Sequence, residues 1–305
     1  MSNAPGETIS ADFPFKSQYA TIDGVRLHYI EEGSGPCLLF LHGNPTWSYI
    51  WRNIVPEVAP YARCVAVDLI GMGKSDKPDI EYRFFDHVRY LEAFITHLRL
   101  RNIVLVMHDW GSKLGFHYAR RHESNVQAAA ILGSMFMPVS SWGDIPDDFR
   151  DTLLGWRSLA GWDLVAERNV FFEEVLPSGI MRDLADEELR QYKSPYKRVA
   201  SRKVLWRWAQ EIPIEGQPAD VGEAMAAVNE WLRKTKLPML LFHATPGGLG
   251  QAPMVDWMTS NVTNLETMHV GKGIHFLQED HPHRIGSHLA HWLRELGLSR
   301  SPEEG

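Results

Sequence analysis

Buried strands and amphipathic helices alternate along the first third of the chain. Continuous apolar runs occupy residues 37–42 (CLLFLH), 64–69 (CVAVDL) and 102–109 (NIVLVMHD), which is typical of parallel strands covered on both faces. Between the second and third runs, residues 83–100 place an apolar side chain at every third or fourth position, which predicts a helix with one apolar stripe. The pattern therefore predicts an α/β fold around a mostly parallel sheet flanked by helices.

The start of this sheet is expected to differ from the rest. Two alternating segments flank Asp23-Gly24, a dipeptide suited to the tight turn of an antiparallel hairpin. Toward the C-terminus, the buried runs 126–133, 237–243 and 265–270 predict further strands, and a last helix is expected within residues 281–297. The sheet is thus predicted to be antiparallel only at its beginning.

A long helical segment interrupts the alternation after the run 126–133. We interpret residues 138–213 as a helical cap inserted into one core domain, which comprises residues 1–137 and 214–305. The cap is rich in tryptophan: it holds Trp142, Trp156, Trp162, Trp206 and Trp208, out of 11 in the chain. Most of these rings are expected to pack the cap helices together, and one or two are expected to face a pocket.

Composition narrows the class of protein. The 305 residues carry 31 Lys and Arg against 38 Asp and Glu, with no block of basic residues, so a nucleic-acid partner is not expected. No segment has the length and apolarity of a membrane helix, and residues 1–17 lack the regions of a signal peptide. Cys37 and Cys64 each begin an apolar run and are expected to be packed rather than bridged. These features predict a cytoplasmic protein without a membrane partner.

No cofactor or metal ion is expected. The segment GMGKSD (71–76) resembles a phosphate loop only superficially, because the Walker pattern requires a glycine where Asp68 stands. The histidines near the last helix lack the spacing to Cys or carboxylates that a metal site needs.

A carboxylate stands at the tip of a predicted strand-to-helix turn. The strand ending at His108 runs directly into Asp109 and then into a helix that begins with small residues. Ligands of open α/β sheets bind at the carboxyl ends of the strands, and a sharp turn from strand to helix presents a nucleophile there. The chain has no G-x-S-x-G motif, so Asp109 rather than a serine is the predicted nucleophile; helix capping is its alternative role.

Two further segments are expected to meet Asp109. The loop LHGNPTWSYIWR (41–52) follows a neighbouring strand, and its Asn44, together with Trp110, offers N–H donors that suit a departing anion such as halide. His275 lies on the loop after the last predicted strand and is the predicted general base, although a lone histidine is more often structural.

Six segments carry a family resemblance: HGNPTWSYIWR, DLIGMGKSDKPDIEYRFFDHVRYLEAF, HDWGSKLGFHYARR, NVFFEEVLP, EIPIEGQPAD and IHFLQEDHPHRIG. They resemble the haloalkane dehalogenases of the α/β-hydrolase superfamily over nearly the whole chain, and they are also similar to Renilla-type luciferases. The resemblance implies the α/β-hydrolase fold with an inserted helical cap and hydrolysis of a carbon–halogen bond without a cofactor. Its partners would be a small apolar halogenated substrate, water and a halide ion, acting in a monomer or homodimer.

Carried over position by position, the family's nucleophile falls on Asp109 and its base on His275. Its halide-holding residues fall on Asn44 and Trp110, and Phe171 and Trp208 match cap positions that line the family's substrate pocket. In this family an alkyl ester forms on the aspartate, and the histidine then activates water to split it.

The sequence departs from the family where an acid should orient the histidine. Gly133 or Ser134 stands where a glutamate is expected, and the loop after 237–243 has no aspartate. Ester hydrolysis is therefore expected to be slow, and a glutamate at 134 or at 133 is expected to restore the charge. A second departure is Ala209, where relatives have proline; this should loosen the halide end of the pocket.

Three other functions fit the same pocket. A luciferase-like cofactor-independent oxygenase or a lyase is the first, and a ligand-binding protein that has lost turnover is the second, supported by the missing acid. An epoxide hydrolase is the third, but that chemistry relies on cap tyrosines, and the cap holds only Tyr192 and Tyr196.

Overall fold

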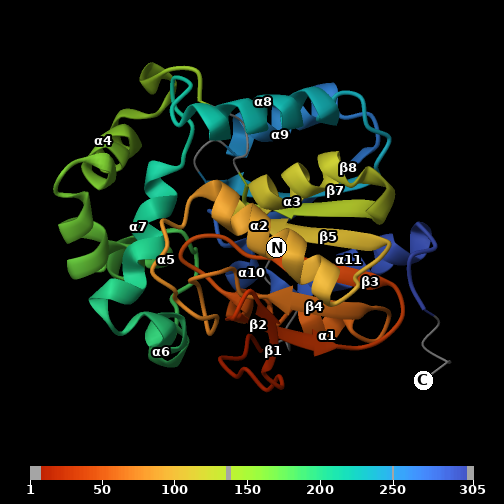
Figure 1. The fold of residues 1–305 in the computed structure, drawn as a ribbon. Coiled ribbons are helices and arrows are strands. Elements are labelled where there is room, and N and C mark those ends of the chain that lie inside the picture. The colour runs from red at the N-terminus through yellow and green to blue at the C-terminus, as the bar shows by residue number, and fades with distance from the viewer. Residues whose placement is uncertain (1–7, 135–138, 249–250, 301–305) are drawn as a thin grey trace.

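A single eight-stranded sheet organises the protein. The computed structural model describes residues 8–134, 139–248 and 251–300 (Figure 1). The spatial order of the strands is β1-β2-β4-β3-β5-β6-β7-β8. Their bounds are β1 (Gln18–Ile22), β2 (Val25–Glu32), β3 (Cys37–Leu41), β4 (Arg63–Val67), β5 (Ile103–His108), β6 (Val126–Leu132), β7 (Met239–Pro246) and β8 (Leu265–Gly273). The β1–β2 and β2–β4 pairs are antiparallel and all others are parallel, which confirms the predicted arrangement.

Helices cover both faces of the sheet. Helices α2 (Phe84–His97), α3 (Trp110–Arg121) and α8 (Ala219–Leu232) pack in a row, and Figure 1 shows α2 and α3 in front of the strands. On the far side, α1 (Val55–Val58) packs against α11 (Pro282–Glu295). Helix α9 (Gln251–Asn261) contacts β7. The short helices η1 (Ser48–Trp51) and α10 (Leu277–Asp280) lie close to each other.

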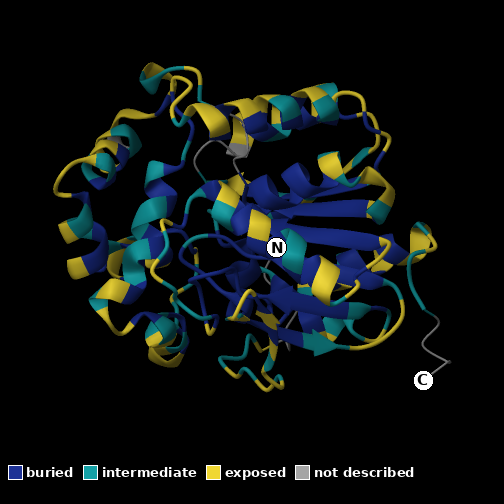
Figure 2. Ribbon diagram, viewed as in Figure 1, coloured by how far each residue is buried: buried dark blue, intermediate teal, exposed yellow. Residues whose placement is uncertain are grey.

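The double cover explains the apolar runs in the sequence. Every residue of β3 and of β5 is buried, because each strand carries helices on both faces (Figure 2). Cys37 and Cys64 are buried and unbridged, as predicted.

The helices between β6 and α8 form a separate group beside the sheet (Figure 1). They are η3 (Trp142–Asp144), α4 (Asp147–Arg157), η4 (Asp163–Glu167), η5 (Phe171–Val175), α5 (Leu176–Ser178), α6 (Asp186–Lys193), η6 (Ser194–Tyr196), η7 (Val199–Arg202) and α7 (Lys203–Gln210). We call residues 139–213 the cap. Its two connections run side by side, since Val139 forms a β-bridge with Ile214. The predicted junction between residues 137 and 138 lies outside the described residues, and the domain bounds stay a prediction.

The register of the parallel strands determines which residues meet at their carboxyl ends. Leu41 of β3 is aligned with Met107 of β5, and His108 of β5 is aligned with Leu132 of β6. Continuing these registers past the strand ends brings Gly43 and Gly133 to either side of Asp109. The site is thus positioned by the centre of the sheet.

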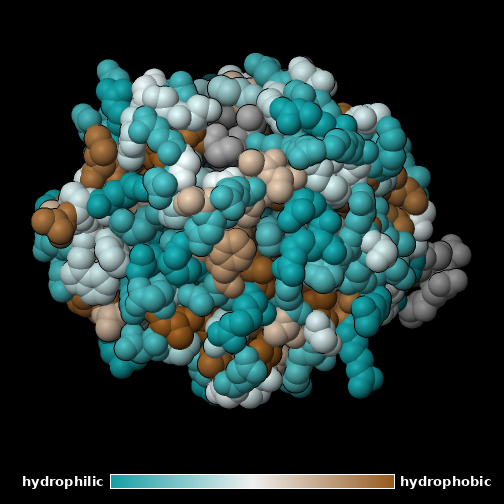
Figure 3. Space-filling view, turned by 45° about the horizontal axis from the view of Figure 1, so that its top comes forward, coloured by the Kyte–Doolittle hydropathy of each residue, from teal (hydrophilic) through white to brown (hydrophobic). Residues whose placement is uncertain are grey.

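The face of the molecule shown in Figure 3 is largely hydrophilic. In the face shown in Figure 3, apolar residues are scattered among polar ones. The exposed large apolar residues within the described ranges are Tyr19, Phe85, Leu154, Leu159 and Met181. None of the described helices has the length and apolar character needed to cross a membrane.

Candidate active site

Asp109 occupies a strained turn between β5 and α3. Its backbone has φ of 50° and ψ of −123°, a conformation that L residues rarely adopt. Such strain persists where the surrounding structure enforces it, and here β5 and the first turn of α3 do so. The turn lifts the carboxylate out of the sheet at its carboxyl edge, as the sequence predicted for a nucleophile.

The loop after β3 holds one oxygen of this carboxylate. The backbone N–H of Asn44 donates to Oδ1 of Asp109 at 2.8 Å. This approach requires glycine at the preceding position, because a Cβ on Gly43 would collide with the Asp109 carboxylate. Oδ1 is thereby fixed by a backbone donor, and Oδ2 is left to face the other side of the site.

His275 faces that second oxygen. Its Nε2 lies 3.6 Å from Oδ2 of Asp109, and the two side chains keep exposed fractions of 28% and 21%. A gap of this size, still accessible to solvent, suits a water molecule or a small substrate approaching both groups.

The backbone around His275 is anchored from two directions. The N–H groups of His275 and Phe276 both donate to the carbonyl oxygen of Gly179 in the cap, at 2.9 and 3.1 Å. Nε2 of the buried His108 lies 3.2 Å from the His275 carbonyl oxygen and is the donor in this contact. Burial, followed by the charge of His275, lowers the pKa of His108 to about 3, so its ring is neutral near pH 7.

Electrostatics favour the ionised form of Asp109. Burial is the largest single influence and raises the pKa of its carboxyl group, but the contact with His275 and the charge of Lys113 are among several opposing influences that together lower it. The pKa of Asp109 is therefore held well below its usual range. The carboxylate is charged at neutral pH, as a nucleophile must be.

The turn after β6 contributes no acid to this site. The hydroxyl of the buried Ser134 is hydrogen-bonded to the hydroxyl of Ser112 and donates to the carbonyl oxygen of Leu132 at 2.8 Å, so it is directed away from His275. Gly133 has φ of 46°, and a Cβ there would collide with the carbonyl oxygen of His275. Within the described ranges, Asp109 is the only carboxylate within 4.0 Å of the His275 ring nitrogens.

Trp110 joins the core site to the cap. It is buried at the start of α3 and stacks on Trp208 of α7, with ring centroids 4.3 Å apart and planes 27° apart. Trp208 stacks in turn on His87 of α2 at 4.0 Å and donates its indole N–H to the sulfur of Met72 at 3.3 Å. The stack places the Trp110 indole between the core site and the cap, where its N–H could meet a ligand.

Phe171, Tyr192 and Tyr196 are further cap residues that were named from the sequence. Phe171 is buried and packs against Trp156 of α4, with ring centroids 4.7 Å apart, and its position at the pocket stays a prediction. Tyr192 donates its hydroxyl to Glu279, and the hydroxyl of Tyr196 accepts the backbone N–H of Gly73. Neither hydroxyl is therefore directed at Asp109, which weakens the case for an epoxide hydrolase.

Several residues at the site were not singled out from the sequence. Gly43 had a signal, since it sits inside the HGNP segment beside Asn44. His108 and the Gly179 carbonyl had no such signal, because a histidine inside an apolar strand and a glycine between cap helices are usually structural. Their contacts with His275 depend on where three distant segments meet.

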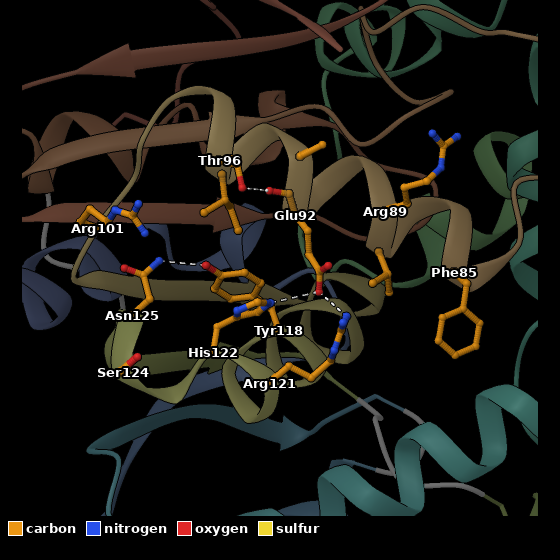
Figure 4. A pocket seen from close by; sticks show the side chains of 13 residues that line it. Phe85, Arg89, Glu92, Thr96, Arg101, Tyr118, Arg121, His122, Ser124 and Asn125 are labelled. Atoms are coloured by element: carbon orange, nitrogen blue, oxygen red, sulfur yellow. Dashed lines mark hydrogen bonds and ion pairs between the residues drawn. The ribbon is translucent and has the colours of Figure 1, made fainter. Parts of the chain in front are cut away.

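A separate groove of about 690 Å³ lies between α2, α3 and η2 (Glu123–Asn125), and it shares no residue with the Asp109 site (Figure 4). Its arginines are partly neutralised within the protein: Arg121 pairs with Glu92, and Arg89 pairs with Asp23. No group of three or more His, Cys, Asp or Glu side chains within the described part of the chain is arranged to hold a metal ion. The Asp109 site is thus the place where strain, charge and a base converge.

Comparisons with known proteins point to one family. Residues 36–282 match the family model described as alpha/beta hydrolase fold. A haloalkane dehalogenase from Mesorhizobium japonicum is 43% identical over 99% of this chain and 98% of its own length. One from Sphingobium indicum is 42% identical over 93% of this chain and 97% of its own.

Solved structures agree with these relatives. The haloalkane dehalogenase DbeA from Bradyrhizobium elkani matches with a TM-score of 0.90 and 38% identity, over 93% of this chain and 99% of that one. A putative ancestral haloalkane dehalogenase matches with a TM-score of 0.89 and 41% identity, over 92% of this chain and 99% of that one.

Proposed function

Since this chain belongs to the haloalkane dehalogenases of the α/β-hydrolase fold, we propose that it hydrolyses carbon–halogen bonds through an ester formed on Asp109. The observation that carries the proposal is that the two carboxylate oxygens of Asp109 have different contacts. Oδ1 accepts the N–H of Asn44, whereas Oδ2 lies 3.6 Å from Nε2 of His275. One oxygen is stabilised in place and the other is accessible for chemistry.

In the first step, Oδ2 of Asp109 attacks the carbon that bears the halogen. The carbon–halogen bond breaks, the halogen leaves with its electron pair as halide, and an alkyl ester remains on Asp109. The indole N–H of Trp110 and the side-chain amide of Asn44 stabilise the departing anion. The low pKa of Asp109 keeps its carboxylate ionised for this attack.

In the second step, His275 takes a proton from water, and the resulting hydroxide attacks the carbonyl carbon of the ester. Negative charge then develops on Oδ1, where the Asn44 N–H already donates. The alcohol departs, Asp109 returns to its carboxylate form, and His275 releases its proton to solvent. The sum is haloalkane plus water giving alcohol, halide and a proton.

The second step is expected to limit turnover. A charged acid stabilises the imidazolium that forms on the base, and removing that charge in serine hydrolases costs on the order of 10⁴ in rate. Here no described carboxylate other than Asp109 pairs with His275. The backbone contacts from Gly179 and His108 fix the position of the base but supply no charge.

The test is a single-turnover reaction with 1-bromobutane, followed by halide release and intact mass. We expect a burst of one bromide per site, a slow phase, and an enzyme mass raised by one butyl group during that phase. His275→Gln should retain the burst and hold the adduct, whereas Asp109→Asn should show neither. Bromide release from Asp109→Asn equal to that of the unchanged enzyme would overturn the proposal.

The other functions considered from the sequence are not favoured, because the compared relatives are named haloalkane dehalogenases. The substrate we propose is a small apolar haloalkane, with water as the second reactant. The cytoplasmic location and the monomeric or homodimeric state stay predictions from the sequence.

A further inference from the structure

Lys113 is a buried lysine on the helix that carries Trp110. Only 3% of the residue is exposed, although α3 otherwise begins with aromatic and small residues. Its Nζ lies 4.4 Å from the centroid of the Trp110 ring, a distance typical of a cation–π contact. The indole of Trp110 therefore has a cation against it as well as the stacked ring of Trp208.

The charge of Lys113 also acts on the nucleophile. It is one of the charges that depress the pKa of Asp109, and Asp109 in turn opposes the effect of burial on Lys113. Burial is the larger influence and lowers the pKa of Lys113 to about 8, so the ammonium group remains mostly protonated at neutral pH. Keeping a cation in this interior is unfavourable for folding, and such groups beside reacting atoms are typical of functional sites.

We propose that Lys113 supplies the positive charge that holds the halide ion at Trp110. This inference rests on the proposed function. When a halide binds beside ionised Asp109, a second negative charge enters a buried site, and the lysine reduces the net charge there from −2 to −1. A cation over the indole face also withdraws electron density from the ring, which makes its N–H a stronger donor. Lys113 thus acts through Trp110 and is a positioning residue.

A purely structural role for Lys113 leads to the opposite expectation. If the side chain only filled space, a methionine of similar length would leave halide affinity unchanged. If the lysine stabilised the fold, its loss would lower the melting temperature. The charge role predicts weaker halide binding in each variant that lacks the cation.

The experiment measures bromide binding to the full-length enzyme by quenching of its tryptophan fluorescence, alongside thermal unfolding. Lys113→Met is expected to weaken bromide affinity about tenfold, which corresponds to about 1.4 kcal/mol, and thermal unfolding checks that the variant is folded. Lys113→Gln removes the same charge with a polar side chain and is expected to weaken bromide binding to a similar extent. The matched control is Lys74→Met, since Lys74 lies 5.4 Å over the ring of Trp47 on the exposed surface.

The outcomes separate this inference from the proposed function. An enzyme that releases bromide from 1-bromobutane, but whose bromide affinity is the same in Lys113→Met, Lys113→Gln and the unchanged protein, would overturn the role of Lys113 alone. An unchanged protein that neither binds bromide nor releases it would overturn both. Equal loss of affinity in Lys74→Met would also count against a local effect at Trp110.

Discussion

The carbonyl oxygen of His275 occupies the space that a Cβ on Gly133 would need. The turn after β6 therefore approaches the base loop more closely than any residue with a side chain allows. In this arrangement, the position expected to carry the orienting acid has no room for a side chain. The turn after β6 and the loop after β8 therefore approach each other through backbone atoms.

Gly133→Ala should disrupt the base loop. Its φ of 46° adds about 1 kcal/mol of strain, and the new Cβ displaces the His275 carbonyl. We expect at least a hundredfold loss of turnover and a loss of unfolding free energy of about 2 to 3 kcal/mol, measured by halide release and chemical denaturation. Gly216→Ala is the matched control, since Gly216 also has positive φ, 73°, but has open space around a Cβ. Equal effects in the two variants would contradict the contact.

The same contact changes the expected result of adding an acid. A glutamate at 133 meets the His275 carbonyl, and a glutamate at 134 would replace a hydroxyl that is directed toward Ser112. We therefore expect neither Gly133→Glu nor Ser134→Glu to accelerate the slow phase of halide release. A hundredfold acceleration by either one would show that the turn after β6 can rearrange to bring the carboxylate to His275.

Trp110→Phe should weaken halide binding while preserving the ring stack. The loss of one N–H donor to a buried anion is expected to cost about 1 to 3 kcal/mol in bromide affinity, measured by inhibition of halide release. Trp208→Phe provides the comparison, because the Trp208 N–H donates to the sulfur of Met72. A larger loss of bromide affinity in Trp208→Phe than in Trp110→Phe would contradict the assignment of the halide donor.

Alkylation should persist in mild acid. Asp109 has a folded pKa well below its unfolded value of about 3.9, so its ionised form, and the stability that this form contributes, are present above pH 4 and are lost only as the pH falls through the lower folded value. The bromide burst should keep its rate between pH 8 and about pH 5, in rapid-mixing measurements, whereas the slow phase requires a neutral His275. A burst rate that halves near pH 6 would contradict the low pKa of Asp109.

Arg52→Met should unfold the junction between cap and core. The buried Arg52 guanidinium donates to Glu279 at 2.6 and 2.9 Å and to Glu188 at 2.6 Å, and Arg182 from the cap pairs with both acids. Removing the buried cation leaves the two buried carboxylates with the partly exposed Arg182 as their remaining cation, and breaking a buried pair in this way typically costs about 3 to 5 kcal/mol.

The matched control for Arg52→Met is Arg190→Met. The exposed pair of Arg190 with Glu187 is expected to contribute less than about 1 kcal/mol. Denaturant midpoints of the two variants should therefore differ clearly, and similar midpoints would mean that the Arg52 cluster does not stabilise the junction.

The sequence by itself determined the class of fold and the order of its parts. Runs such as 102–109 are apolar because the strand is covered on both faces. This pattern lies within one segment, so that segment alone is enough to predict the strand. The position of Asp109 after β5 and of Asn44 after β3 also follows locally, because the carboxyl ends of parallel strands lie at one edge.

Only the tertiary structure decided how these residues are held. Ser134 is hydrogen-bonded to Ser112, and Gly133 meets His275, because the register of β5 against β6 and the path of the loop after β8 bring together segments far apart in the chain. Lys113 was not singled out from the sequence. Its burial against Trp110 depends on how the neighbouring helices pack around α3. The effect of its charge therefore depends on atoms that are distant in the sequence.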